Sequence, residues 1–87
     1  MVVTNWKKEN INLTEMEEKV VKHLLESETL EDAKCDSPAE IAECTDINVK
    51  SLRGVIASLV KKDVAYVDEL ISGCGDWVIL YDSVDVV

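Results

Sequence analysis

The chain has 87 residues and a formal net charge of −9, with 18 acidic residues against nine Lys and Arg. This length permits one domain with a single modest core, and one Pro and three Gly exclude a linker or low-complexity segment. No apolar run approaches the roughly 20 residues needed to cross a bilayer, and the start lacks the apolar stretch of a signal peptide. We therefore expect a cytoplasmic protein with no membrane partner.

The first predicted element is a helix that follows Thr14. Thr14 and Glu17 have the spacing of a capping box, in which each side chain accepts a hydrogen bond from the other residue's backbone N–H. Apolar residues then recur at helical spacing, at Met16, Val20, Val21, Leu24 and Leu25. His23 lies beside this stripe, and we interpret it as a boundary residue. An acidic connection follows over residues 27–36.

A second, short helix is predicted to begin at Ser37. Pro38 suits the first helical position and Glu40 completes a second capping box. Its buried side is expected to hold Ile41, Ala42 and Cys44. The helix must be short, because "CTDIN" (residues 44–48) supplies turn and capping residues only a few positions later.

A third helix is predicted from Asn48 to about Lys62. Its core stripe consists of Leu52, Val55, Ile56, Leu59 and Val60. A strand over residues 64–67 and a returning strand over 77–82 follow. The glycines at 73 and 75 suit the positive φ that the turn between these strands can require.

The order helix, short helix, turn, long helix, β-hairpin resembles the winged helix-turn-helix family, which includes MarR-like regulators. The residues that carry the likeness are "EIAECTDINVKSLRGVIASLVKKDVAYV", residues 40–67. The resemblance implies an α+β fold of three helices followed by a β-hairpin wing over residues 13–82. Residues 1–12 are then an N-terminal extension and 83–87 a C-terminal tail. Asp63 stands where many relatives have a glycine, and Asp tolerates the left-handed conformation.

Charge is segregated along the chain. Residues 48–62 carry four basic residues and no acidic one, giving +4, whereas the remaining chain carries −13. The resemblance implies that this third helix enters the major groove of double-stranded DNA. The residues assigned to DNA contact in this way are Asn48, Lys50, Ser51, Arg53, Gly54, Lys61 and Lys62. Two alternatives stay open: Lys61 and Lys62 also offset the helix dipole, and Gly54 is also tolerated on a solvated surface.

The acidic charge of the predicted wing argues against DNA binding by this hairpin. Residues 67–77, "VDELISGCGDW", contain three acidic residues and no basic one, so this hairpin is not expected to contact phosphates. The alternative function is therefore a winged-helix module that binds a protein, through an apolar patch of Leu70, Ile71 and Trp77. A sharper version is an acidic phage-type inhibitor that imitates DNA phosphates. The carboxylates that would do so are Glu15, Glu17, Glu18, Glu26, Glu28, Glu31 and Asp32, although such a run is more often a solvated helix face.

Catalysis and cofactors are not expected. One His, no Gly-rich phosphate loop and no nucleophile–base pair leave no active site to assign. Cys35, Cys44 and Cys74 match no disulfide framework; the first two are interpreted as buried small hydrophobes and the third as exposed. A zinc site completed by His23 is the less favoured alternative, because the spacings lack a Cys-x-x-Cys pair. The sequence leaves a monomer and a homodimer open.

Overall fold

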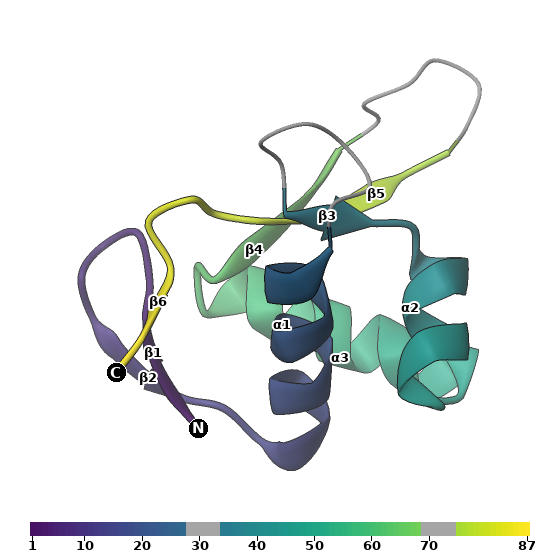
Figure 1. The fold of residues 1–87 in the computed structure, drawn as a ribbon, viewed down its shortest axis with the longest axis horizontal. Helices are drawn as coiled ribbons and strands as arrows, with labels where there is room; N and C mark the ends of the chain where they lie inside the picture. Colours follow the sequence, from purple (N-terminus) through teal and green to yellow (C-terminus); the bar gives the residue numbers. More distant parts are fainter. Residues whose placement is uncertain (28–33, 69–74) are drawn as a thin grey trace.

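The computed structural model describes residues 1–27, 34–68 and 75–87. These residues form three helices and two small antiparallel sheets (Figure 1). The helices are α1 (Glu15–Glu26), α2 (Pro38–Thr45) and α3 (Val49–Lys61). The strands are β1 (Val2–Thr4), β2 (Asn10–Asn12), β3 (Cys35–Asp36), β4 (Ala65–Asp68), β5 (Trp77–Leu80) and β6 (Asp85–Val86). The chain is thus a small α+β domain, and none of its described helices is long and apolar enough to cross a membrane.

The first sheet has the strand order β3-β5-β4. β4 and β5 form the antiparallel hairpin predicted for this part of the chain, with Ala65 opposite Leu80 and Asp68 opposite Trp77. β3 was not predicted, because two residues inside an acidic connection carry no readable strand pattern. It pairs Cys35 with Ile79 and so adds a third strand to the hairpin. The turn proposed at Gly73 lies outside the described residues, whereas Gly75 has a positive φ of 81°.

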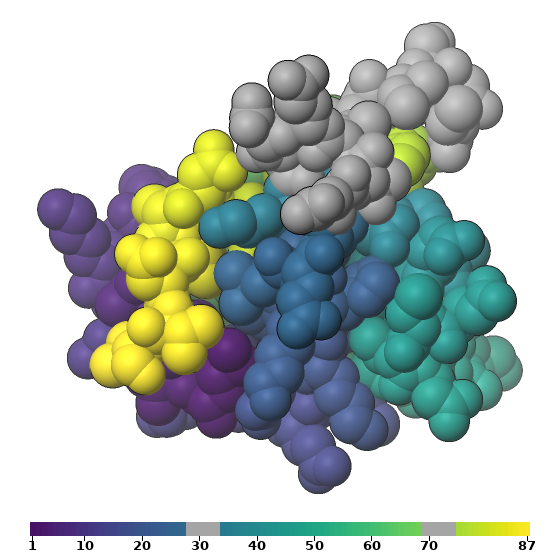
Figure 2. Space-filling model, viewed as in Figure 1, coloured from purple at the N-terminus to yellow at the C-terminus, as the bar shows by residue number. Residues whose placement is uncertain are grey.

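The second sheet has the order β2-β1-β6 and joins the two ends of the chain. Val3 of β1 lies opposite Ile11 of β2 and Val86 of β6. Residues 1–12 and 83–87, expected to be an extension and a tail, therefore pack together (Figure 2, purple and yellow). The expected order of three helices followed by a hairpin is corrected accordingly: two strands precede α1, and β3 separates α1 from α2.

The helices begin where their capping residues predict. The Thr14 hydroxyl accepts from the Glu17 N–H while the Glu17 carboxylate accepts from the Thr14 N–H. Ser37 and Asn48 cap α2 and α3 by accepting hydrogen bonds from the backbone N–H groups of Glu40 and Lys50. The predicted second capping box is incomplete, because the Ser37 N–H donates to Oδ1 of Asp36 instead of to Glu40. Asp46, between α2 and α3, has a left-handed conformation.

Asp63 closes α3 in the left-handed conformation expected of it, with φ 59°. Its N–H donates to the Val60 carbonyl, and the Val64 N–H donates to the Leu59 carbonyl. This pair of bonds is a Schellman motif, which satisfies carbonyls that the helix end leaves open. The motif turns the chain directly from α3 into β4.

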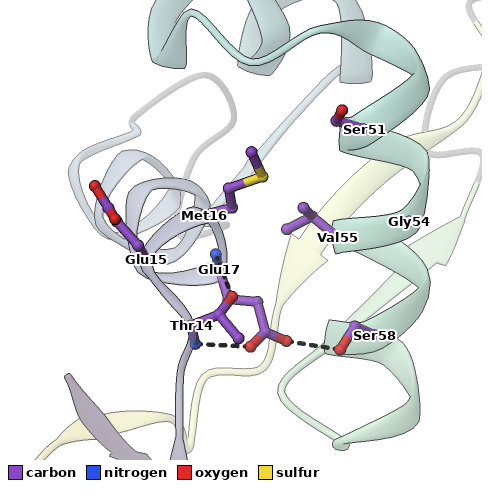
Figure 3. A pocket seen from close by; sticks show the side chains of 8 residues that line it. All are labelled: Thr14, Glu15, Met16, Glu17, Ser51, Gly54, Val55 and Ser58. Atoms are coloured by element: carbon purple, nitrogen blue, oxygen red, sulfur yellow. Dashed lines mark hydrogen bonds between the residues drawn. The ribbon is translucent and has the colours of Figure 1, made fainter.

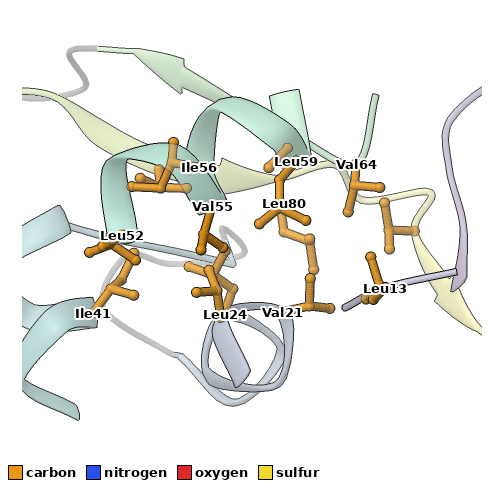
Figure 4. Close-up of a cluster of buried hydrophobic side chains, with 14 of the residues drawn as sticks. Leu13, Val21, Leu24, Ile41, Leu52, Val55, Ile56, Leu59, Val64 and Leu80 are labelled. Carbon is orange, nitrogen blue, oxygen red and sulfur yellow. The ribbon is translucent and has the colours of Figure 1, made fainter. Parts of the chain in front are cut away.

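The core lies between the three helices and the first sheet (Figure 4). Its members from α3 are Leu52, Val55, Ile56 and Leu59, as predicted. Met16, Val60 and Cys44, which were also expected inside, are exposed. Met16 faces an open groove beside α3, and Cys44 faces an open pocket beside α1, so neither is covered by close packing. Periodicity identifies the stripe but not how far a neighbour covers it.

Candidate nucleic-acid interface

The connection between α2 and α3 sets the direction of α3. It consists of three residues, Asp46 to Asn48, and its central residue Ile47 is buried in the core. A three-residue turn between two helices is compatible with a helix-turn-helix motif. Because Leu52 and Leu59 face the core, the opposite side of α3 is left to solvent.

That outer side carries the basic residues. Lys50, Arg53 and Lys61 are all exposed, and their spacing of three and eight residues places them on one side of the helix. Within the described part of the chain, none of the three makes an ion pair, and α3 contains no acidic residue. Asn48 and Ser51, the other predicted contacts, are exposed at the N-terminal end of α3. Six of the seven predicted residues, Gly54 included, are therefore brought together on an open surface.

Gly54 lies on the exposed surface of α3. A Cβ placed on Gly54 would meet nothing within 4 Å, so the packing of this chain does not require a glycine there. A glycine inside a helix costs about 1 kcal/mol relative to alanine. The fold itself gives no reason for a glycine at this position. Close approach of another molecule to the α3 backbone would give one.

Lys62 is the predicted contact that the structure places elsewhere. Its Nζ lies 2.7 Å from Oε1 of Glu17 and 3.5 Å from the Asn12 carbonyl oxygen. The Ser58 hydroxyl donates to the other oxygen of the same carboxylate at 2.8 Å (Figure 3). The end of α3 is thereby fastened to the start of α1. Lys62 holds the helix in place and leaves Lys61 as the basic residue exposed at this end.

Glu17 is the buried centre of this network. Burial alone would raise the pKa of its carboxyl group, but the hydrogen bonds from Lys62, Thr14 and Ser58 together outweigh burial and lower that pKa below its usual value. Glu17 is consequently ionised and fully engaged at neutral pH. It does not belong to the solvated acidic face on which the sequence analysis placed it.

An open groove lies between the first turn of α1 and α3 (Figure 3). It has a volume of about 410 Å³ and is lined by Thr14, Glu15, Met16, Glu17, Ser51, Gly54, Val55 and Ser58. Its surface is mainly apolar, and Met16, with 46% of its surface exposed, lies on its α1 side. Sequence reasoning missed this groove because the periodicity placed Met16 with the core residues.

The alternative protein-binding residues are only partly placed. Trp77 is half-buried, and its indole N–H has no acceptor among the described residues. Leu70 and Ile71 lie outside the described residues. Of the carboxylates proposed to imitate phosphates, Glu15 and Glu26 are exposed, and Glu18 pairs with Lys22 at 3.0 Å. Glu28, Glu31 and Asp32 lie outside the described residues.

His23 joins α1 to β3. Its Nε2 lies 2.7 Å from Oδ2 of Asp36, a buried residue whose Oδ1 accepts from the Ser37 N–H. Cys35 is buried as expected, and burial raises the pKa of its thiol. Cys74 lies outside the described residues, and within the described part no three potential metal ligands lie together.

Comparison of the chain with protein-family models, curated proteins and solved structures gives no match. Its function therefore has to be inferred from its own residues and their geometry.

Proposed function

We propose that this chain is a winged-helix protein that binds double-stranded DNA through α3 and regulates transcription. The order of α1, α2, the three-residue turn, α3 and the β4–β5 hairpin supports the winged-helix assignment. In proteins of the helix-turn-helix type, the second helix of the motif lies in the major groove. Here that helix is α3.

The observation that carries this proposal is the outer face of α3. Lys50, Arg53 and Lys61 are exposed there without ion pairs to other described residues, although the whole chain carries nine more negative than positive charges. In a chain so acidic, three unpaired cations on one helix face provide a local site for phosphates. Gly54 lies among them and leaves room for close approach to the helix backbone.

The three cations set an expected salt dependence. If each neutralises one phosphate, α3 contributes about −2.7 per chain to the slope of log K against log salt, which is about a 40-fold loss of affinity between about 50 and 200 mM salt. A symmetric dimer that binds with both α3 helices doubles the slope. The same titration therefore reports the number of chains bound.

The test compares Arg53→Glu with Lys19→Glu by fluorescence anisotropy on a mixed-sequence duplex. Lys19 is exposed on α1, so both variants change the net charge equally, and circular dichroism checks that both fold. We expect Arg53→Glu to weaken binding at least about tenfold, with the affinity of Lys19→Glu staying within about twofold of the wild type. Equal losses in the two variants would show that only net charge matters, which contradicts recognition by α3.

Protein binding is the second candidate, and the groove beside Met16 favours it. The groove is mainly apolar and open, and its α3 wall includes Gly54 and Val55. Apolar side chains from a partner suit such a surface better than phosphates do, because Glu15 lies at its edge. Absence of DNA binding by the wild type at about 50 mM salt, where non-specific contacts are strong, would favour this candidate.

A further inference from the structure

The turn between β1 and β2 is built around the side chain of Asn5. Asn5 is buried, and its Oδ1 accepts hydrogen bonds from the backbone N–H groups of Lys7 and Glu9, both at 3.0 Å. Lys8 completes the turn in the left-handed conformation, with φ 62°. The turn is therefore closed by side-chain hydrogen bonds, as in an Asx turn, and its outward residues are held in defined positions.

The same asparagine attaches this turn to the end of α3. Nδ2 of Asn5 donates to the Lys62 carbonyl oxygen at 2.9 Å, and Nζ of Lys7 lies 2.9 Å from Oδ2 of Asp63. The turn thus lies against the residues that directly follow Lys61, the last exposed cation of the α3 face. Residues 57 positions apart in the sequence are thereby joined by a hydrogen bond.

The turn exposes an aromatic residue and two cations. Trp6 is 48% exposed and packs at a tilt on Tyr81, with ring centroids 6.3 Å apart. Lys7 lies over the Trp6 ring, 5.4 Å from its centroid. Lys8 is exposed and makes no ion pair with any other described residue.

Two acidic residues at the turn differ in how their charge is offset. Asp63 pairs with Lys7, and the Glu9 carboxylate accepts from Nδ2 of Asn5 at 3.1 Å. Lys7 offsets the charge of Asp63, whereas Glu9 has a neutral amide donor and keeps its charge, so Lys8 is the cation of the turn that makes no ion pair with another described residue. Trp6 adds an indole N–H donor and a half-exposed apolar ring to the same turn.

We infer that the β1–β2 turn is a second DNA-contacting element, in which Lys8 and Trp6 meet the sugar-phosphate backbone beyond the C-terminal end of α3. This inference rests on the proposed function of α3. A helix in the major groove has the flanking phosphates at its ends, and contacts to them fix the register of a protein on the duplex. Residues 67–77 of the β4–β5 hairpin contain no basic residue, so we assign the flanking phosphate contact to Lys8 of this turn.

The test measures the salt dependence of duplex binding for Lys8→Asn, with Lys19→Asn as the matched control. Asn is chosen because it tolerates the left-handed conformation at position 8. Loss of one phosphate contact makes the slope of log K against log salt less negative by about 0.9 per bound chain. The ratio of wild-type to Lys8→Asn affinity is therefore expected to fall about 3.5-fold between about 50 and 200 mM salt. The control is expected to keep the wild-type slope.

Asp63→Asn provides a test with the opposite sign. It keeps a residue that suits the left-handed conformation while releasing Lys7 from its ion pair, so the slope is expected to become more negative by about 0.9. Trp6→Phe is expected to abolish the change in tryptophan fluorescence on DNA binding, since Trp77 is the other tryptophan in the chain and lies in the hairpin that DNA does not meet.

The outcomes separate the two proposals. Unchanged slopes for Lys8→Asn and Asp63→Asn, together with a loss of binding in Arg53→Glu, would overturn the contact at the turn and leave recognition by α3 in place. A wild-type protein that does not bind the duplex at about 50 mM salt would overturn both.

Discussion

Lys62 and Glu17 join the end of α3 to the start of α1, with Nζ 2.7 Å from Oε1. The Glu17 side chain is 2% exposed and that of Lys62 is 32% exposed, so an ionised carboxylate is buried beside a cation that still reaches solvent. This pair turns Lys62 away from the predicted DNA surface. It also fixes the orientation of the helix that presents Lys50, Arg53 and Lys61.

Lys62→Met is expected to destabilise the protein by about 2 kcal/mol, because it leaves the buried Glu17 carboxylate with neutral donors only. The figure is below that for a fully buried pair because Lys62 is partly exposed. Urea unfolding at neutral pH measures the loss. Lys61→Met, one residue earlier and exposed, is the matched control, and an equal loss there would show that the ion pair contributes nothing specific.

Stability is expected to depend on pH through Glu17. Its pKa in the folded protein is lowered, so ionised Glu17 contributes stability above its unfolded-state pKa of about 4.3, and this contribution is lost as the pH falls through the folded-state pKa. Glu17→Gln should therefore be less stable than the wild type at neutral pH, and the difference should shrink in acid. Denaturant unfolding across this pH range measures it, and a constant difference would contradict the assignment.

Gly54→Ala is expected to change stability and DNA binding in opposite directions. Because a Cβ at this position meets nothing within 4 Å, the replacement removes the helix cost of glycine and should stabilise the fold by about 0.5–1 kcal/mol. The added methyl group should weaken duplex binding if the DNA approaches the α3 backbone closely. Thermal unfolding and anisotropy measure the two effects. A stabilised variant with wild-type affinity would place the DNA away from Gly54.

His23→Ala is expected to destabilise the protein by about 1–2 kcal/mol, because it removes a hydrogen-bond partner from the buried carboxylate of Asp36. The effect should be strongest in β3, whose two residues include Asp36. Hydrogen exchange of the β3 and β5 amides, with urea unfolding, measures it. Cys44→Ala, an exposed change on the neighbouring α2, is the control and should leave both measurements nearly unchanged.

Val3→Ala tests whether the second sheet belongs to the folded core. Val3 is fully buried, and truncation of such a side chain costs about 2 kcal/mol through lost burial and the cavity that remains. Val87→Ala changes an exposed residue directly after β6 and should have little effect on the free energy of unfolding. Equal free energies of unfolding in urea for the two variants would contradict the packing of β1 on the core.

Local signals predicted much of this fold. The capping residues Thr14, Ser37 and Asn48 and the apolar stripes placed three helices within a residue or two of their observed bounds. Asp63 was expected in the left-handed conformation and has it. These features depend on interactions between residues no more than about five positions apart, which the sequence displays directly.

The second sheet was not predictable in this way. β1, β2 and β6 have two or three residues each, too few for a pattern of alternation to stand out. Their turn depends on the Asn5 side chain instead of a glycine, and β6 pairs with a strand at the other end of the chain. Such pairing depends on where α1 and the first sheet bring the termini together.

Local sequence patterns were sufficient to place the helices, the β4–β5 hairpin and the concentration of positive charge in residues 48–62. Which of those charges pair with another described residue depends on the packing of the helices. Lys62 differs from Lys61 by one position, a rotation of about 100° around α3, and that rotation points it at the buried carboxylate of Glu17. Whether a cation faces a partner 45 residues away depends on how α1 packs on α3, and no local pattern contains that information.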